Sequence, residues 1–90
     1  MYYVYIIESQ LDGDLYKGST SDYQKRLEQH NNGKSKFTST KMPWRLVFIQ
    51  EFETKTLALV HEKKLKRYNK NYLRWLIVQP VNILNKNLER

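Results

Sequence analysis

The chain opens with a run of aromatic and β-branched residues over positions 2–8, and this run most constrains the fold. Residues of these types favour β-strands. Asp12 and Gly13 follow, and glycine tolerates the positive φ that tight turns require. Residues 14–19 then predict the returning strand. The opening of the chain therefore predicts a β-hairpin, so the fold must contain an antiparallel sheet.

A helix is expected next, over residues 22–32 approximately. Ser21 is the expected N-cap, with Gln24 placed three residues later as in a capping box. Tyr23 and Leu27 are four residues apart and give the helix one apolar stripe. Asn32 and Gly33 end it.

The second half of the chain predicts one more strand and two more helices. A basic loop over residues 34–43 leads to a strand at 45–53. Thr54 or Thr56 is the expected cap of a helix that runs to residue 67, and residues 72–78 predict a shorter helix. The stripe of the longer helix is expected to contain Leu57, Ala58, His61 and Leu65. The order ββαβαα predicts an α+β fold, a three-stranded antiparallel β-sheet flanked by helices.

Ninety residues allow one small domain, and the absence of cysteine excludes disulfides and thiolate metal sites. The longest apolar runs, such as residues 75–78, are far shorter than the ~18 residues of a membrane span. The N-terminus has no basic region and no small-residue cleavage site of the kind that marks a secretory signal. We therefore expect a cytoplasmic protein with no membrane association.

The formal charge of +7 is unevenly distributed. Residues 1–60 hold eight basic and seven acidic side chains, whereas residues 61–90 hold eight basic and two acidic ones. A second basic stretch lies at residues 34–45. A fold that gathers these cations on one side attracts polyanions, although a merely soluble cationic surface explains the charge equally well.

Five side chains stand out as candidates for chemistry. Tyr5 and Tyr16 lie on the two strands of the predicted hairpin, where they either share a face or simply pack as strand residues. Arg26 and His30 are four residues apart and share a helix face, either as a phosphate-binding and proton-handling pair or as a solvated surface. Glu62 stands among lysines, either as a ligand for one Mg²⁺ or as a partner of Lys66 in a helical salt bridge.

Taken in order, these motifs resemble the GIY-YIG nuclease superfamily, specifically its small stand-alone bacterial members. A Tyr-x-Tyr strand precedes residues 16–22, Tyr-Lys-Gly-Ser-Thr-Ser-Asp, and the sequence Arg-Leu-x-x-His-Asn follows at 26–31. Pro-Trp-Arg-Leu-Val at 43–47 precedes Ala-Leu-x-x-Glu-Lys-x-Leu-Lys at 58–66. The resemblance covers residues 1–78, which implies a GIY-YIG domain at 1–78 and a C-terminal tail at 79–90.

The resemblance implies a metal-dependent phosphodiesterase whose catalytic residues are Tyr5, Tyr16, Arg26, His30 and Glu62. In this family Glu62 corresponds to the single metal-binding carboxylate, which would hold Mg²⁺ or another divalent cation. The sequence departs from the family pattern at Tyr3, Val4 and Lys17, which replace the glycine of the first motif and the isoleucines of both motifs. The asparagine that many members carry after the glutamate helix has four candidates here: Asn69, Asn71, Asn82 and Asn85.

The function expected from this resemblance is hydrolysis of DNA phosphodiester bonds, with Tyr5 or Tyr16 as general base. The alternatives are a non-catalytic nucleic-acid-binding module and a protein-interaction domain with a vestigial site, for which Trp44, Tyr68, Tyr72 and Trp75 would supply a partner surface. The partner is nucleic acid, most simply DNA, with a protein partner supplying specificity, and the chain is expected as a monomer or weak dimer. The residues expected to contact nucleic acid are Lys17, Lys34, Lys36, Lys41, Arg45, Lys63 and Lys66.

Overall fold

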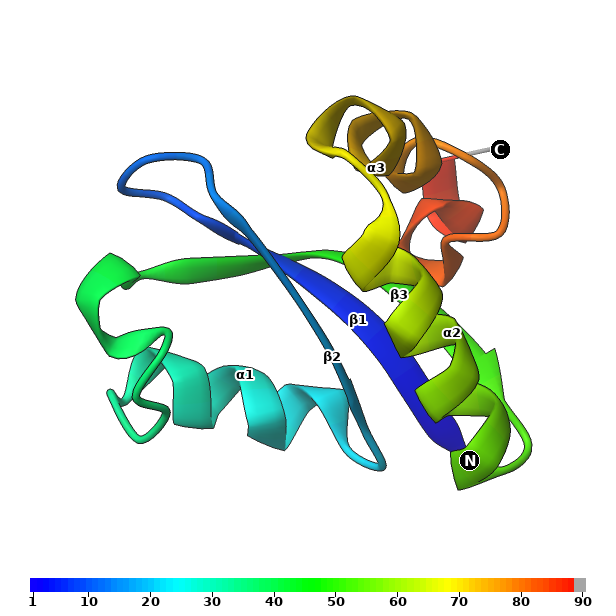
Figure 1. Cartoon of the computed structure of the whole chain (residues 1–90), viewed down its shortest axis with the longest axis horizontal. Coiled ribbons are helices and arrows are strands. Elements are labelled where there is room, and N and C mark those ends of the chain that lie inside the picture. Colours follow the sequence, from blue (N-terminus) through cyan, green and yellow to red (C-terminus); the bar gives the residue numbers. More distant parts are fainter. Residues whose placement is uncertain (89–90) are drawn as a thin grey trace.

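The structure, a computed structural model, describes residues 1–88 and the side chains of residues 1–85. Its strands are β1 (Tyr2–Ser9), β2 (Leu15–Thr20) and β3 (Trp44–Phe52). Its α-helices are α1 (Tyr23–Asn31), α2 (Lys55–Arg67) and α3 (Lys70–Ile77), with short 3₁₀ helices η1 (Ser39–Lys41) and η2 (Ile83–Leu88). The strands form one antiparallel sheet in the order β2-β1-β3 (Figure 1). The predicted α+β fold with a three-stranded sheet is confirmed.

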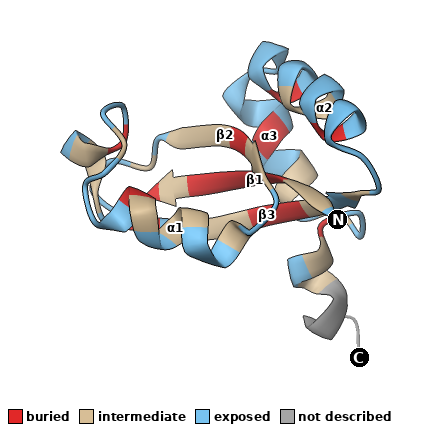
Figure 2. Cartoon of the chain, turned by 90° about the horizontal axis from the view of Figure 1, so that it is seen from below, coloured by how far each residue is buried: buried red, intermediate tan, exposed pale blue. Residues whose placement is uncertain are grey.

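The central strand β1 is buried on both faces, because helices cover both sides of the sheet. Figure 1 shows α1 and α2 on either side of the β1–β2 hairpin, and Figure 2 shows that the buried residues gather on β1 and β3. Successive side chains of a strand point to opposite faces. Tyr5 and Ile7 therefore pack toward α1, whereas Val4 and Ile6 pack toward α2 and α3.

The face beneath α2 and α3 is an apolar core. Its fully buried members come from two strands and both helices: Val4, Ile6, Phe48, Ala58, Leu65 and Leu73. The register between β1 and β3 shifts between Ile6 and Ile7, where Val47 is the extra residue on β3. A bulge of this kind lets Phe48 face this core while Leu46 faces the α1 side.

Two details of the predicted helices differ from the structure. Asp22, not Ser21, caps α1, because the Asp22 carboxylate accepts a hydrogen bond from the backbone N–H of Lys25. The hydroxyl of Thr20 bonds the Asp22 backbone and fixes which of the two neighbouring residues takes the cap. The prediction of Leu57 in the buried stripe of α2 is wrong, since Leu57 is 48% exposed. The Thr54 cap is confirmed by its hydrogen bond from the Leu57 N–H.

The segment after α3 returns to the sheet through Asn82, which is fully buried. Its amide oxygen accepts from the backbone N–H of Ile49, and its amide nitrogen donates to the carbonyls of Val47 and Ile77. One side chain thereby fastens residues 79–85 to the outer edge of β3. Within residues 1–88, no helix has the length and apolar character needed to cross a bilayer.

Candidate active site around strand β2

The ring of Tyr5 lies directly against the backbone of Gly18, its partner across the β1–β2 ladder. A Cβ atom placed on Gly18 would stand 2.5 Å from the Tyr5 hydroxyl and 2.7 Å from its ring carbon Cζ. Both distances are shorter than any ordinary contact, so a side chain at this position would displace the ring. Glycine at position 18 is therefore what allows Tyr5 to lie flat across β2 toward α1.

The Tyr5 hydroxyl begins a buried chain of hydrogen bonds. It lies 2.9 Å from Nε2 of His30, and Nδ1 of His30 lies 2.8 Å from the hydroxyl of Thr38. The Thr38 hydroxyl donates in turn to the carbonyl of Ser35 at 3.4 Å. The backbone carbonyl of Thr38 accepts from the Trp44 indole N–H at 2.8 Å. His30 and Thr38 are fully buried. The basic loop is thus anchored to the sheet through one tyrosine and one histidine.

The direction of this chain follows from its last acceptor and from the charge of His30. Burial, helped by the nearby Arg26 guanidinium, lowers the pKa of His30 to about 4, so its ring is neutral at neutral pH. A carbonyl only accepts, so Thr38 donates to Ser35 and accepts from Nδ1–H of His30. A neutral ring protonated at Nδ1 accepts at Nε2. Tyr5 therefore donates its proton to His30.

Tyr5 itself is held in its neutral form. Burial raises the pKa of Tyr5 to about 12; the negative charge that Tyr16 can carry adds to the rise, and Arg26 opposes it. The pKa of His30, near 4, makes it a poor acceptor for a full proton transfer. The pair therefore acts as a fixed hydrogen bond that orients the Tyr5 ring.

Tyr16 lies beside this pair and is less deeply buried. Its ring meets the His30 ring edge-on at 5.0 Å between centroids and lies 6.5 Å from the Tyr5 ring. Trp44 closes the other side at 6.4 Å. Tyr16 is therefore the more accessible of the two phenols in the aromatic cluster.

Arg26 reaches the same cluster from α1. It is half-buried, its Nη1 donates to Gln29 at 3.0 Å, and its charge acts on both Tyr5 and His30. A guanidinium has five N–H donors, so further ones remain for an anion. Arg26 is thus a cation that shifts the pKa values of both Tyr5 and His30.

Glu62 approaches β2 from the opposite face, on α2. One carboxylate oxygen accepts from the Ser19 hydroxyl at 2.6 Å, and the other pairs with Lys66 at 2.7 Å. Burial opposes ionisation, but the bonds from Lys66 and Ser19 prevail and lower the pKa of Glu62. Its charge still reaches Tyr5, and that of Lys66 reaches Tyr16. Ser19 follows Gly18 directly, so the two faces of the site meet at one point on β2.

The five predicted catalytic residues thus divide into two groups around the edge strand. Tyr5, Tyr16, Arg26 and His30 form one cluster beneath α1. Glu62 lies across β2 and is joined to that cluster by electrostatics. The alternative that the spacing predicts for Glu62, a helical salt bridge with Lys66, is present in the structure.

The predicted nucleic-acid contacts fall into paired and exposed cations. Lys41 pairs with Asp12 and Asp14, and these carboxylates raise the pKa of Lys41 to about 12. Arg45 pairs with Glu8, whose second oxygen binds Arg74. In contrast, three of the predicted lysines are exposed and lie on the α1–η1 loop and on α2: Lys34, Lys36 and Lys63.

Lys17 faces away from the tyrosine cluster. Strand alternation places it with Leu15 and Ser19 on the α2 side, opposite Tyr16 and Gly18. Its ammonium group lies 3.4 Å from the Leu15 carbonyl. Lys17, which replaces the isoleucine of the second motif, is therefore no neighbour of the Tyr5 phenol.

The asparagine candidates divide by location. Asn69 caps α3, and Asn82 donates to the backbone of β3. Asn85 donates to the carbonyls of Ile77, at the end of α3, and of Gln79. Asn71 is exposed on α3. Three of the four amides are thus engaged in local structure.

Three residues of the site were not identified from the sequence: Gly18, Thr38 and Ser19. Each acts through a contact distant in sequence. Gly18 and Ser19 lie within the quoted motif at residues 16–22, but that motif did not assign a role to either of them. Gly18 carried one detectable signal, since a glycine inside a predicted strand marks a bulge or a close approach. Thr38 and Ser19 carried none, because buried and exposed hydroxyls look alike in a sequence.

Comparison with known proteins places this arrangement in a family. The model of the GIY-YIG catalytic domain matches residues 1–74, so the chain belongs to the GIY-YIG family, a nuclease-type family. A UPF0213 protein of Staphylococcus saprophyticus is 39% identical over 70 residues, which cover 77% of this chain and 84% of the relative. A UPF0213 protein of Staphylococcus aureus strain Mu3 matches with the same identity and coverage.

A solved structure is similar as well. The solution NMR structure of a UPF0213 protein from Bacillus halodurans is 34% identical, with a TM-score of 0.58. The match covers 90% of this chain and 87% of that one. The resemblance drawn from the motifs is therefore confirmed, and the chain groups with the small bacterial GIY-YIG proteins called UPF0213.

Proposed function

We propose that the chain is a divalent-metal-dependent endonuclease that hydrolyses DNA phosphodiester bonds at β2. The observation that carries the proposal is the meeting of two groups at one edge strand. A buried tyrosine–histidine pair and a guanidinium lie beneath it, and an ionised carboxylate lies across it. Phosphodiester hydrolysis needs a base, a cation for the phosphoryl oxygens and a ligand for a metal ion.

The donor set at Glu62 fits Mg²⁺ rather than zinc. Mg²⁺ uses one or two carboxylates and completes its shell with waters and substrate oxygens. The lowered pKa of Glu62 keeps it ionised, and Ser19 orients one of its oxygens. Within the part of the chain that the structure describes, no group of three or more His, Cys, Asp or Glu side chains suits a closed metal site. When bound, the ion would stabilise charge on the phosphate and on the leaving oxygen.

Tyr16 is the favoured base, and Tyr5 the residue that positions it. Tyr5 is 3% exposed and donates its proton to His30, so it cannot readily meet a water molecule. Tyr16 is less buried than Tyr5, and Lys66 lies within electrostatic reach of it. An ordinary phenol ionises only near pH ~10, so a base of this kind needs positive charge beside it.

Arg26 is proposed to bind a non-bridging phosphate oxygen through its remaining N–H groups. Charge-assisted bonds of this type are strong, and the half-buried guanidinium is already positioned by Gln29. The exposed lysines Lys34, Lys36 and Lys63 then supply phosphate contacts that hold the duplex without reading bases. Lys41 and Arg45 would first have to leave their carboxylate partners.

Nicking of supercoiled plasmid in the presence of Mg²⁺ tests the proposal. We expect Tyr16→Phe and Glu62→Gln each to slow nicking by about 100-fold or more, since each removes a group that acts in the reaction. Glu51→Gln is the matched control, because Glu51 is an exposed carboxylate on β3. Chelation by EDTA should stop the reaction in the wild-type chain. Full nicking by both site variants contradicts the assignment.

Binding without cleavage is the second candidate, and the Glu62–Lys66 pair favours it. An ammonium group 2.7 Å from the carboxylate competes with a metal ion for the same oxygen. Salt-sensitive DNA binding with no metal-dependent product in any variant would establish this alternative. A Lys66→Gln variant that gains nicking activity would instead show that the lysine restrains a working site.

A further inference from the structure

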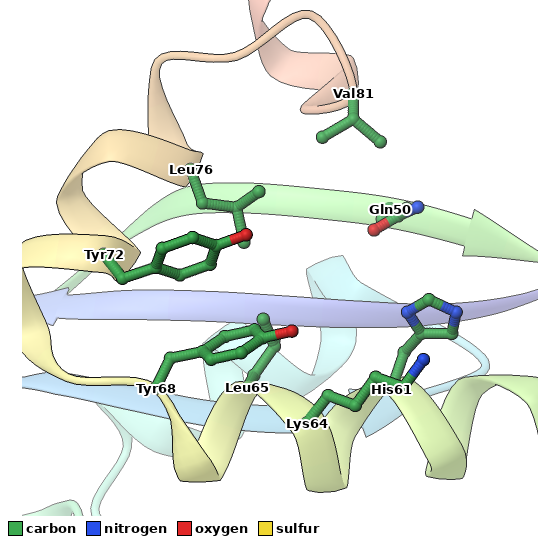
Figure 3. Close-up of a pocket in the computed structure, with 8 residues that line it drawn as sticks. All are labelled: Gln50, His61, Lys64, Leu65, Tyr68, Tyr72, Leu76 and Val81. Atoms are coloured by element: carbon green, nitrogen blue, oxygen red, sulfur yellow. The ribbon is translucent and has the colours of Figure 1, made fainter.

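A second site lies on the far flank of α2, away from the cluster at β2. It is a cavity of about 240 Å³ among α2, α3, β3 and the segment after α3. Its walls are shown in Figure 3 and are formed by Gln50, His61, Lys64, Leu65, Tyr68, Tyr72, Leu76 and Val81. Glu62 and Lys66 project from α2 toward β2, and His61 and Lys64 project toward this cavity, so the helix separates the two sites.

Aromatic rings form one wall of the cavity and continue beyond it. Tyr68 and Tyr72 lie with ring centroids 4.4 Å apart, and Trp75 adds a third ring 5.3 Å from Tyr72. Their exposed fractions are 38%, 41% and 53%. In Figure 3 the two tyrosine rings lie one above the other with their hydroxyls directed into the cavity. This ladder of rings offers partly exposed π-faces whose planes are inclined to each other by 52° and 39°.

Polar groups line the rest of the cavity. The Gln50 amide both donates and accepts, and Lys64 and His61 add nitrogen groups (Figure 3). Burial and the Lys64 charge lower the pKa of His61, so its ring offers one donor and one acceptor. Among the described side chains, no carboxylate lines the cavity. The chemistry is that of a stacking surface beside hydrogen-bonding groups, which is what a nucleobase requires.

Positive charge surrounds this surface. Residues 61–74 contain six basic side chains and a single acid, Glu62. Lys66 and Arg74 are paired with Glu62 and Glu8, whereas the remaining four are exposed or line the cavity: Lys63, Lys64, Arg67 and Lys70. The ladder of rings thus runs beside cations that suit a polyanion backbone.

We propose that the cavity and the ladder Tyr68–Tyr72–Trp75 bind single-stranded nucleic acid, with one base in the cavity and its neighbours stacked on the exposed rings. The phosphates would contact Lys64, Arg67 and Lys70. Stacking on aromatic side chains within a basic groove is the general mode of single-strand binding. Duplex DNA keeps its bases stacked inside and offers no such faces. This site goes beyond the proposed cleavage at β2 and does not depend on it.

Fluorescence anisotropy of a labelled oligothymidylate at low salt, with EDTA present, tests the site without any cleavage. Tyr72→Ala should weaken binding by about 10-fold, in line with the loss of one stacked base. Tyr72→Phe retains the ring and should retain the affinity. This result would show that Tyr72→Ala weakens binding through the loss of stacking and not through a folding defect. Phe37→Ala is the control, since Phe37 is an 85% exposed ring on the α1–η1 loop. Equal affinity of the wild type, Tyr72→Ala and Trp75→Ala overturns the proposal.

The charge contribution is measured separately by salt dependence. Lys64→Gln should lower the slope of log affinity against log salt by about 0.7, the value for one phosphate of a single strand. Lys25→Gln, an exposed lysine on α1, should leave it unchanged. An acidic peptide that displaces the oligonucleotide equally from wild type and Tyr72→Ala would overturn the proposal in favour of an acidic protein partner.

Photocrosslinking gives a direct readout. An oligonucleotide that carries 5-iodouracil should crosslink within residues 68–75 in the wild type and in Glu62→Gln alike. Loss of nicking in the Glu62→Gln variant with full crosslinking would show that the two sites are separate. Crosslinks confined to the Tyr16 region would overturn the proposal.

Discussion

The two faces of the sheet are stabilised by different means. The face beneath α2 and α3 is filled by aliphatic and aromatic carbon, with Phe48 and Ile6 fully buried. The face beneath α1 also has an apolar cluster, with Ile7 and Trp44 buried, but it buries in addition the polar chain Tyr5–His30–Thr38. Apolar contacts tolerate small shifts in position, whereas a buried polar chain costs free energy unless each member finds its partner. We therefore expect the face beneath α2 and α3 to contribute most of the free energy of unfolding. The face beneath α1 fixes the positions of its side chains more accurately.

The largest effect is expected on the apolar face. Phe48→Ala should reduce the free energy of unfolding by about 3–5 kcal/mol, because it opens a cavity in a fully buried position. Urea unfolding followed by circular dichroism measures this. Leu59→Ala, on the exposed side of α2 at 41% exposure, is the control and should change stability by about 0.5 kcal/mol or less. Equal losses in the two variants would contradict the comparison.

On the face beneath α1, the buried His30 should make the free energy of unfolding depend on pH. The pKa of His30 is about 4 in the folded chain and 6.5 in a model peptide. As the pH falls from 6.5 towards 4, the unfolded state binds the proton first, so the free energy of unfolding falls. Above pH 6.5 the contribution of His30 to stability is fully present. The loss amounts to about 3 kcal/mol at most.

The free energy of unfolding, plotted against pH between these two values, should therefore have a shallower slope for His30→Gln than for the wild type. His61→Gln is the matched control on the other face, where the imidazole is only partly buried. A wild-type slope retained by His30→Gln and lost in His61→Gln would reverse the roles of the two faces.

Gly18→Ala should disturb the polar face with a loss of about 1–3 kcal/mol, the usual cost of forcing extra atoms into a packed site. The added Cβ would stand 2.5 Å from the Tyr5 hydroxyl, so the ring must move and the bond to His30 must break. The cost should vanish in a Tyr5→Ala background, where no ring remains to be displaced. A persistent cost there would locate the problem in the backbone of β2.

Thr38→Val should give the smallest effect, about 1–2 kcal/mol, because it keeps the shape and leaves the His30 Nδ1–H without an acceptor. Thr40→Val is the control at an exposed position two residues away. Thermal unfolding of both variants measures the difference. Identical melting temperatures would show that the Thr38 hydroxyl contributes nothing to the buried chain.

Much of this fold could be predicted from the sequence, because strands and helices leave periodic patterns. The hairpin followed from the residue types at 2–8 and from the turn at Asp12 and Gly13, and the longer helix from its Thr54 cap. The Asp22 cap was missed because Ser21 and Asp22 are both good caps and only the contact with Thr20 decides. Leu57 was wrongly included in the buried stripe because residue spacing does not show how far around the helix the buried surface extends.

The candidate site was less accessible to prediction. The family pattern indicated Tyr5, Tyr16, Arg26, His30 and Glu62, but their catalytic roles stay predictions until activity is measured. Gly18 and Thr38 matter because of what lies against them, Tyr5 in one case and His30 in the other. Such partners are distant in sequence, so no local pattern encodes them.

The amide of Asn82 has a consequence for how the sheet ends. An outer strand presents free backbone groups that invite another chain to extend the sheet, which is a route to aggregation. Asn82 accepts from the N–H of Ile49 and donates to the carbonyl of Val47, two groups on the outer edge of β3. One side chain thus pairs with β3 as a neighbouring strand would, and it closes this edge to strand addition at its most apolar point.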